Sequence, residues 1–451
     1  MELMFEMANI LIAPLGVGPT EKREYNHATY TFCGENDFIK TPFAAAFLVQ
    51  KLNIDKVFFI GTAHSLWEEV YRFFTEESGG EVDVEYWDSL AEKVFSSNHK
   101  EAKVTKDDLV KVNNAVDLFL KKVNPRAKGG THCFLISYGI SEKEIWKNAD
   151  VFWDIKEKLA DEDNVYLDIT HSFRHIPLFM YLMMDFTQML SGKNVKLQGI
   201  YYGMLDITKE LGHTPVVDLG SLFKISEWIK GVYEFINYGN GYLIADLIQR
   251  EKGENSFSDR IKTISDLLNL NGLVNLRDEL KGLKKALGSD DLPSIPMFKY
   301  ILPQFEMFFK NFSNLDNDFL FQMDLSAWYF KNKKYATGYI CLLEALLTGL
   351  CDVFELEANY DNKEIIKNFL HKGKRECRQF NLINQYEHLE KNYKKINRVR
   401  QLAAHSSLEK GISYQKYIDQ ALEIHQEIKK LFEKKDKLAF LRFINIVNYK
   451  N

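Results

Sequence analysis

Residues 166–177 read YLDITHSFRHIP, and this stretch decides how the first half of the chain is interpreted. It begins as an apolar strand, together with Val165, and passes Asp168 at the end of that strand. A polar cluster follows the strand and consists of Thr170, His171, Ser172, Arg174 and His175. Pro177 and an apolar helical pattern come after this cluster. Turns between buried elements rarely need two imidazoles and a guanidinium. The stretch therefore predicts a functional turn at the end of a buried strand.

Length, composition, net charge and cysteine content limit the class of protein that this chain can be. A length of 451 residues predicts two or three domains, and 46% hydrophobic with 27% charged residues predicts a globular chain. The net charge of −5 gives no global attraction to nucleic acid. Five cysteines without a CxxC pair favour a reducing compartment over zinc or disulfides. The N-terminus lacks the basic start of a signal peptide, and Asp185, Glu344 and Asp352 interrupt the most apolar windows. We therefore expect a cytoplasmic protein without a membrane span.

Strand-like and helix-like patterns alternate over the first ~215 residues. The expected strands are 9–13, 56–60, 82–86, 133–138, 165–169 and, as the last one, 195–202. Most of them are continuous apolar runs separated by helical patterns, which predicts a mostly parallel sheet covered on both faces. The fold class is thus a Rossmann-like α/β domain followed by an all-α part.

From Ser221 onward the strand patterns stop and helical spacing continues to the C-terminus. The stretch 288–296 (GSDDLPSIP) has the composition of a linker. We therefore predict three parts: residues 1–215 as the Rossmann-like domain, 216–296 as a helical connecting region and 297–451 as a second, helical domain.

Glycines, hydroxyls and free N–H groups follow several of the expected strands. In an open parallel sheet these turns meet at one edge, where ligands bind, and such groups suit phosphates. The residues predicted to bind are Gly16, Val17, Gly61, Thr62, Ser65, Thr170, His171, Ser172 and Arg174. Ordinary turn and helix-capping chemistry is the alternative reading of each turn taken singly. Neither GxGxxG after the first strand nor a P-loop motif is present, so dinucleotide and P-loop sites are disfavoured.

The second motif is NRVRQLAAHSS at 397–407, which contains Arg398, Arg400 and His405. Histidine suits the proton transfers of metal-free RNA cleavage, and arginine stabilises the charge that develops on the phosphate. On one helix, residues seven apart share a face, whereas residues five apart lie roughly 140° apart. Arg398 therefore aligns with His405 within one chain, and Arg400 can join His405 where two subunits meet. The alternative is an ordinary basic helix.

Taken in this order, DITHSFRHIP and RQLAAH resemble the CARF–HEPN ribonucleases of type III CRISPR systems, and the segments GTAHSLW and GIYYGM add to the resemblance. The resemblance implies an N-terminal CARF sensor that binds a cyclic oligoadenylate across a homodimer, with tetra-adenylate favoured over hexa-adenylate. It also implies a C-terminal HEPN nuclease that cuts single-stranded RNA without a metal or other cofactor. Arg400 and His405 would take the motif positions, with the role of Arg398 open.

Two other readings remain open at this point. One is a non-catalytic cyclic-nucleotide sensor or adaptor, with the option that its sensor domain slowly degrades its own activator through Thr170 and His171. A small-molecule enzyme on a Rossmann-like sheet would need a dinucleotide or metal signature, and the sequence contains neither.

Overall fold

The structure is a computed structural model that describes residues 7–17, 26–95, 104–171, 173–253, 255–288, 292, 294–405, 414–433 and 438–450. The chain divides into two compact units, Met1–Lys224 and Ile225–Asn451. The first unit therefore extends beyond the predicted end at residue 215. The predicted division of the helical part at residues 296 and 297 stays a prediction.

All described strands lie in one sheet of the first unit. They are β1 (Asn9–Pro14), β2 (Ala28–Phe32), β3 (Ile39–Thr41), β4 (Lys56–Thr62), β5 (His132–Ile136), β6 (Asn164–Asp168), β7 (Lys196–Gly203) and β8 (Thr214–Asp218). Their order in the sheet is β3-β2-β8-β7-β6-β1-β4-β5. Pairing is antiparallel only between β2 and β3 and between β7 and β8, so the predicted mostly parallel sheet is confirmed.

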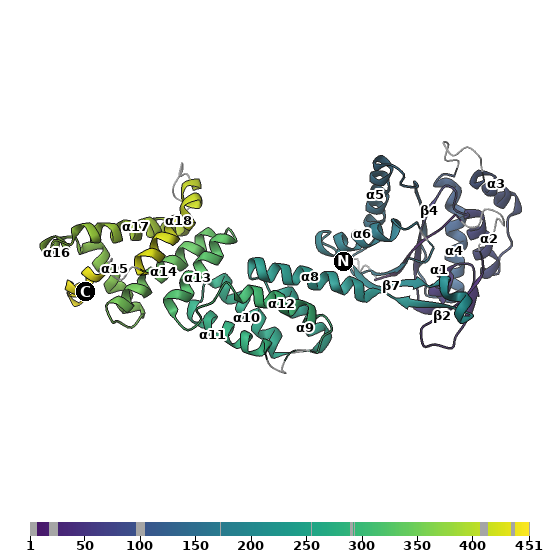
Figure 1. Ribbon diagram of the computed structural model, residues 1–451. Helices are drawn as coiled ribbons and strands as arrows, with labels where there is room; N and C mark the ends of the chain where they lie inside the picture. The colour runs from purple at the N-terminus through teal and green to yellow at the C-terminus, as the bar shows by residue number, and fades with distance from the viewer. Residues whose placement is uncertain are drawn as a thin grey trace, which may run out of the picture. The chain divides into compact units, whose positions relative to one another are not determined.

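Helices cover both faces of this sheet (Figure 1). One face packs against α1 (Ala44–Leu52), α2 (Trp67–Ser78) and α4 (Val110–Val123), and α3 (Val84–Val94) packs against α2. The other face packs against α5 (Glu142–Glu157) and α6 (Ile176–Leu190). Side chains alternate along each strand, so Leu11 of β1 enters the first core and its neighbours Ile10 and Ile12 enter the second.

Three sequence predictions are corrected here. Residues 82–86 do not form a strand, because Asp83 caps the N-terminus of α3 by accepting a hydrogen bond from the backbone N–H of Tyr86. The stretch 195–202 is not the last strand, since β8 follows it and forms an antiparallel pair with β7. The edge strands β2 and β3 were not predicted, because they are short and lack a continuous apolar run.

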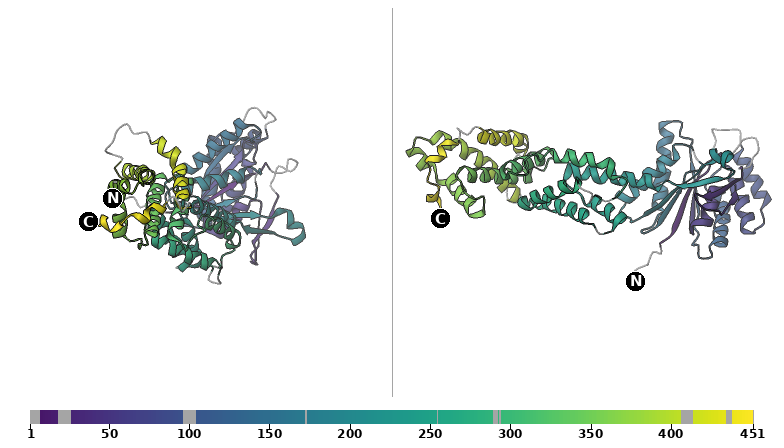
Figure 2. Two further views of the ribbon diagram at one scale, coloured as in Figure 1. Left: turned by 60° about the vertical axis from the view of Figure 1, so that its left-hand side comes forward. Right: turned by 60° about the horizontal axis from the view of Figure 1, so that its bottom comes forward.

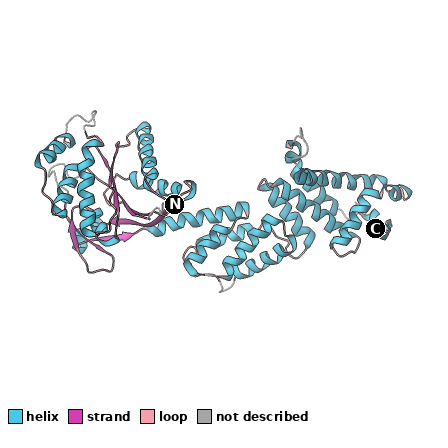
Figure 3. Cartoon of the chain, turned by 180° about the vertical axis from the view of Figure 1, so that it is seen from behind, coloured by secondary structure: helices cyan, strands magenta, loops and turns pink. Residues whose placement is uncertain are grey.

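The second unit contains no strand within its described residues (Figures 2 and 3). Its helices are α9 (Tyr242–Lys252), α10 (Ser256–Leu270), α11 (Leu273–Leu287), α12 (Phe298–Phe309), α13 (Asp318–Lys331), α14 (Tyr335–Val353), α15 (Tyr360–Lys372), α16 (Lys374–Gln379), α17 (Ile383–His405) and α18 (Gln415–Glu433), preceded by α8 (Gly220–Tyr238). Two hydrophobic clusters stabilise it. One is built mainly from residues 228–329, and the other from residues 319–446.

Helix α14 is long and apolar enough to cross a membrane by length and composition, with a mean hydropathy of 1.4. In this structure 67% of that apolar window is buried, and the helix packs against α13, α15, α17 and α18. Its position at the centre of a helical core accounts for its apolar composition.

Candidate functional site

The turn after β6 lies at the topological switch point of the sheet. Strand β1 is hydrogen-bonded to β6 on one side and to β4 on the other. The chain leaves β4 for a helix on one face and β6 for a helix on the opposite face. Because β1 and β6 are parallel with Ile12 and Leu167 as register partners, Gly16 and Val17 follow β1 at the same edge of the sheet at which Thr170 and His171 follow β6. Ligands of open parallel sheets bind in this crevice.

A buried carboxyl group organises the start of this turn. Asp168 is 1% exposed, and its carboxyl accepts a hydrogen bond of 2.8 Å from the backbone N–H of Thr170. The Thr170 hydroxyl in turn accepts a hydrogen bond of 2.9 Å from the backbone N–H of Gly203, at the end of β7. Burial raises the pKa of Asp168 to about 6, although the hydrogen bonds from Thr170 oppose this shift. The turn is thereby tied to two strand ends.

His171 is held by a residue that the sequence analysis missed. The hydroxyl of Tyr30, in β2, lies 3.1 Å from Nε2 of His171. Burial lowers the pKa of His171 to about 4, so the imidazole is neutral at pH 7. Burial, and secondarily the charge of Asp168, raises the pKa of Tyr30, so its phenol stays protonated and can donate to Nε2. Nothing in the sequence links Tyr30 to a turn that follows 140 residues later in the chain.

The predicted residues at the end of β4 and just after it make hydrogen bonds and packing contacts within the protein. The Ser65 hydroxyl is fully buried, donates to the backbone oxygen of Leu15 and accepts from the N–H of Thr62. The Trp67 indole donates to the backbone oxygen of Thr62, and a Cβ at Gly61 would lie 2.6 Å from that indole ring. These positions hold the end of β1, which carries Gly16, through bonds within the protein. Their predicted contact with a ligand is untested.

The other residues predicted at this edge of the sheet differ in their exposure to solvent. Arg174 is exposed, in keeping with a side chain that can reach a ligand. Gly16 and Val17 are half-buried at the sheet edge. Ser172 lies outside the described residues.

A row of aromatic and imidazole rings crosses the same edge and was not predicted as part of the site. The ring of Tyr138, after β5, is nearly parallel to that of His64 with centroids 6.2 Å apart, and it meets the edge of Phe173 at 5.6 Å. Phe173 is stacked with His175 at 6.0 Å. Burial lowers the pKa of His175, and its Nε2 has no hydrogen-bond partner among the residues described. The sequence signals that could have indicated these rings are the segments HSF at 171–173 and YG at 138–139.

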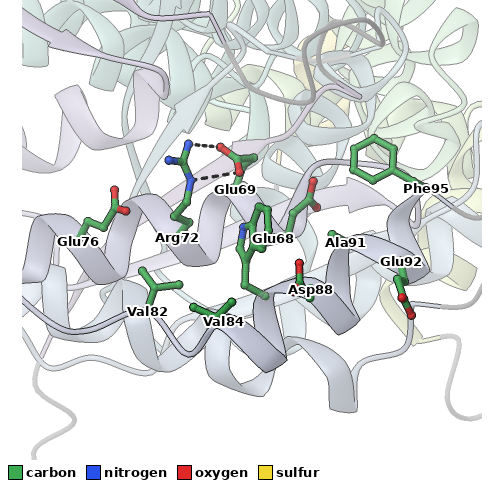
Figure 4. A pocket seen from close by; sticks show the side chains of 11 residues that line it. Glu68, Glu69, Arg72, Glu76, Val82, Val84, Asp88, Ala91, Glu92 and Phe95 are labelled. Carbon is green, nitrogen blue, oxygen red and sulfur yellow. Dashed lines mark hydrogen bonds and ion pairs between the residues drawn. The ribbon is translucent and has the colours of Figure 1, made fainter.

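A separate cavity of about 930 Å³ lies between α2 and α3 (Figure 4). Carboxylates dominate its lining, which includes Glu76, Asp88 and Glu92, and the one guanidinium there, Arg72, is paired with Glu69. A negatively charged cavity repels phosphates, so the phosphate-binding site is not expected there. Across the described part of the chain, no group of three or more His, Cys, Asp or Glu residues is arranged to hold a metal ion.

The arginine–histidine motif lies at the end of α17 in the second unit. Arg398 and Arg400 are both exposed. The helix continues without a break to position 405, so positions 398 and 405 share one side and position 400 lies elsewhere around the helix. The side chain of His405 is outside the described residues. Within one protomer the helix therefore favours Arg398 as the neighbour of position 405.

Comparisons with known proteins agree with the fold of the first unit. Residues 10–206 match the family model described as the CARF domain of the CRISPR system endoribonuclease Csx1. This range includes the switch-point turn and β1 to β7, and β8 follows it. Residues 224–318 match the second domain of CRISPR-associated protein MJ1674. Together these matches support a CRISPR-associated protein with a CARF domain.

One curated relative is MJ1674 itself, from Methanocaldococcus jannaschii, which is 41% identical over 408 residues. The alignment includes 90% of this chain but 63% of the relative, so this chain spans less than two thirds of that protein's length. A solved structure, Enterococcus italicus Csm6 bound to cyclic hexa-2'-fluoro-hexa-dAMP, aligns over 99% of both chains with 11% identity and a TM-score of 0.38.

Proposed function

We propose that this protein is a CRISPR type III accessory endoribonuclease of the CARF–HEPN kind, activated allosterically by a cyclic oligoadenylate. The observation that carries the proposal is the Thr170–His171 turn at the switch point of a sheet that matches a CARF domain. Cyclic tetra-adenylate is the favoured activator and hexa-adenylate the second choice. The proposed setting is the cytoplasm.

The sheet edge offers groups that suit a ring of nucleotides joined by phosphates. The exposed guanidinium of Arg174 can pair with a phosphate. Gly16 lets the backbone after β1 approach the ligand closely. Because His171 is neutral, it can serve as a hydrogen-bonding group to a ribose or phosphate without adding charge.

We propose that the active form is a homodimer assembled through α6. Leu178, Leu182 and Met189 are 65%, 59% and 52% exposed, and their spacing of four and seven residues places them along one side of the helix. This apolar side begins directly after the activator-binding turn, so a second copy docked there would bring two such turns together. Leu182→Asp should convert the dimer to a monomer in native mass spectrometry, whereas a variant that remains dimeric would contradict this interface.

The proposed chemistry is metal-independent cleavage of single-stranded RNA at a composite site made by α17 of both subunits. A histidine base removes the proton of a 2′-OH, whose oxygen attacks the adjacent phosphorus. The bond to the 5′-oxygen breaks, an acid protonates that oxygen, and a 2′,3′-cyclic phosphate remains. His405 would carry the proton transfers, and Arg400, with Arg398, would stabilise the charge on the phosphorane.

The test is cleavage of a fluorogenic single-stranded RNA in EDTA, with and without cyclic tetra- or hexa-adenylate. Cleavage should require an activator, and His405→Ala should abolish it without weakening activator binding. His388→Ala is a matched control, since His388 is an exposed histidine on the same helix and should be dispensable. Full activity of His405→Ala would refute the nuclease assignment.

A second candidate function is a sensor that binds the activator and degrades it slowly without cutting RNA. It is favoured by His171, which is neutral at pH 7 and directly follows Thr170 in the turn. A pKa of about 4 makes this imidazole a weak base, so slow turnover is expected. Chromatography of the activator after incubation would detect it, and His171→Ala should abolish the loss of activator.

A further inference from the structure

A buried tyrosine of α17 holds an exposed histidine of α15. Tyr393 is 2% exposed, and its hydroxyl lies 3.0 Å from Nε2 of His371, in the last turn of α15. The two rings meet edge to face, with centroids 5.2 Å apart and planes at 79°. His371 itself is exposed. The contact therefore fixes a surface imidazole in one orientation.

The hydrogen bond also selects the tautomer of His371. The Tyr393 hydroxyl has no other partner within the described part of the chain, so it is satisfied as a donor when it points its proton at Nε2. Nε2 is then the acceptor, and the proton of the neutral ring is on Nδ1. Nδ1 has no protein partner among the described residues. An exposed N–H donor of this kind suits a phosphate or a base edge.

This imidazole lies on the Arg400 side of α17. Arg400 follows Tyr393 by seven residues, which places it within about 20° of Tyr393 around the helix and about 10 Å further along the axis. Burial raises the pKa of Tyr393, and the charge of Arg400 is near enough to oppose that shift. A strand bound at Arg400 and continuing along this side of α17 would reach His371.

The surroundings of His371 are cationic. Lys372, Arg375 and Arg378 follow it at the end of α15 and in α16, and all three are exposed. Three nearby carboxylates are paired with lysines, and a fourth, Glu376, accepts a hydrogen bond from the Tyr449 hydroxyl. Glu364 is paired with Lys367, Glu387 with Lys374 and Glu390 with Lys394. A phosphate chain would thus meet little repulsion here.

We propose that His371, oriented by Tyr393, is a second RNA contact that binds the substrate strand beside the Arg400 site. The inference rests on the proposed function and deepens it by assigning a path for the RNA. His371 makes the contact and Tyr393 is a positioning residue. A purely structural role is the alternative, in which Tyr393 fastens α15 to α17 and His371 stabilises the C-terminus of α15.

The chain offers a matched control for that alternative. Tyr386 also lies on α17, is fully buried, and donates from its hydroxyl to the backbone oxygen of Leu370 at 2.8 Å. It fastens the same two helices without touching His371. Tyr393→Phe and Tyr386→Phe thus remove equivalent helix contacts, but only the first removes the orientation of His371.

Binding of a fluorescent single-stranded RNA to the 451-residue chain, in EDTA and in the His405→Ala background, separates the two roles. His371→Ala and Tyr393→Phe should each weaken binding about ten-fold, the value of one hydrogen bond to a charged group, whereas Tyr386→Phe should leave it unchanged. In the otherwise wild-type chain with activator, the first two should raise KM and leave kcat unchanged.

Unchanged RNA affinity in both His371→Ala and Tyr393→Phe would overturn the inference, as would an equal loss in Tyr386→Phe. Thermal melting of each variant confirms that it is folded. If the wild-type chain binds RNA but does not cleave it, the proposed nuclease fails while the binding comparison still decides the role of His371. If the chain binds no RNA, both proposals are overturned.

Discussion

Replacement of Asp168 by asparagine should make the stability of the sheet around β6 rise with pH, over an interval in which the stability of the wild-type sheet changes little. In the native chain the pKa of Asp168 is raised by burial from 3.8 to about 6. Between these pH values the native state holds a proton that the unfolded state has released. This group alone therefore makes stability fall as pH rises, by about 3 kcal/mol over the interval.

His171 acts in the opposite direction over nearly the same interval. Burial lowers its pKa from 6.5 to about 4, so the unfolded state holds a proton that the native state lacks. Its contribution makes stability rise by about 3 kcal/mol as pH increases from about 4 to 6.5. The two contributions nearly cancel in the wild-type chain. In Asp168→Asn the rise from His171 should remain alone.

Hydrogen exchange measured by mass spectrometry reads this effect locally, on peptides that cover β1 and β6, after correction for the chemical dependence of exchange on pH. The opening free energy in Asp168→Asn should rise by about 3 kcal/mol between pH 4 and 6.5. The double variant Asp168→Asn/His171→Gln should be nearly flat. Any constant cost of the buried asparagine cancels when slopes are compared. Parallel profiles for Asp168→Asn and wild type would refute the reasoning.

Three further substitutions test the architecture of the switch-point edge. Tyr30→Phe removes the hydrogen bond to His171 and should weaken activator binding about five-fold by isothermal titration, so an unchanged Kd would exclude a role for that bond. Ser65→Ala leaves the backbone groups that the hydroxyl serves unpaired and should lower the unfolding free energy by about 1–3 kcal/mol in urea titration; no change would show that water replaces it. Gly203→Ala places a Cβ 3.0 Å from the Tyr30 ring and 3.1 Å from the Thr170 methyl group, and should destabilise by about 1–3 kcal/mol. An undiminished melting temperature would contradict that packing.

The parallel core of the sheet was predictable because its strands are buried on both faces and read as continuous apolar runs, such as residues 56–60. The antiparallel edge was not, since β2 and β8 carry threonines and a proline and differ little from loops in composition. Residues 82–86 alternate like a strand, but the Asp83 cap and the burial of Leu90 and Val94 one turn apart favour a helix.

The site was predictable in part for the same reason. The Thr170–His171 turn follows a recognisable strand, so its place at the sheet edge could be inferred from local sequence. The partners of that turn could not, because Tyr30 and Gly203 are brought to it by long-range strand pairing. From its place in the sequence, Ser65 is a reasonable ligand-binding residue. Its burial and its hydrogen bond to Leu15 in the structure show that the hydroxyl is bonded within the protein.

The bond between Tyr30 and His171 also has a consequence for the order in which the chain matures during synthesis. Strand β2, which carries Tyr30, pairs only with β3 and with β8, and β8 begins at Thr214. A ribosome that has released residues up to the start of α6 has therefore supplied both Tyr30 and His171, but not the strand β8 that pairs with β2. The Thr170–His171 turn is completed only after β8, near the end of the first unit, has emerged. A nascent chain that stops before β8 would contain the DITHSFRHIP sequence without its finished geometry.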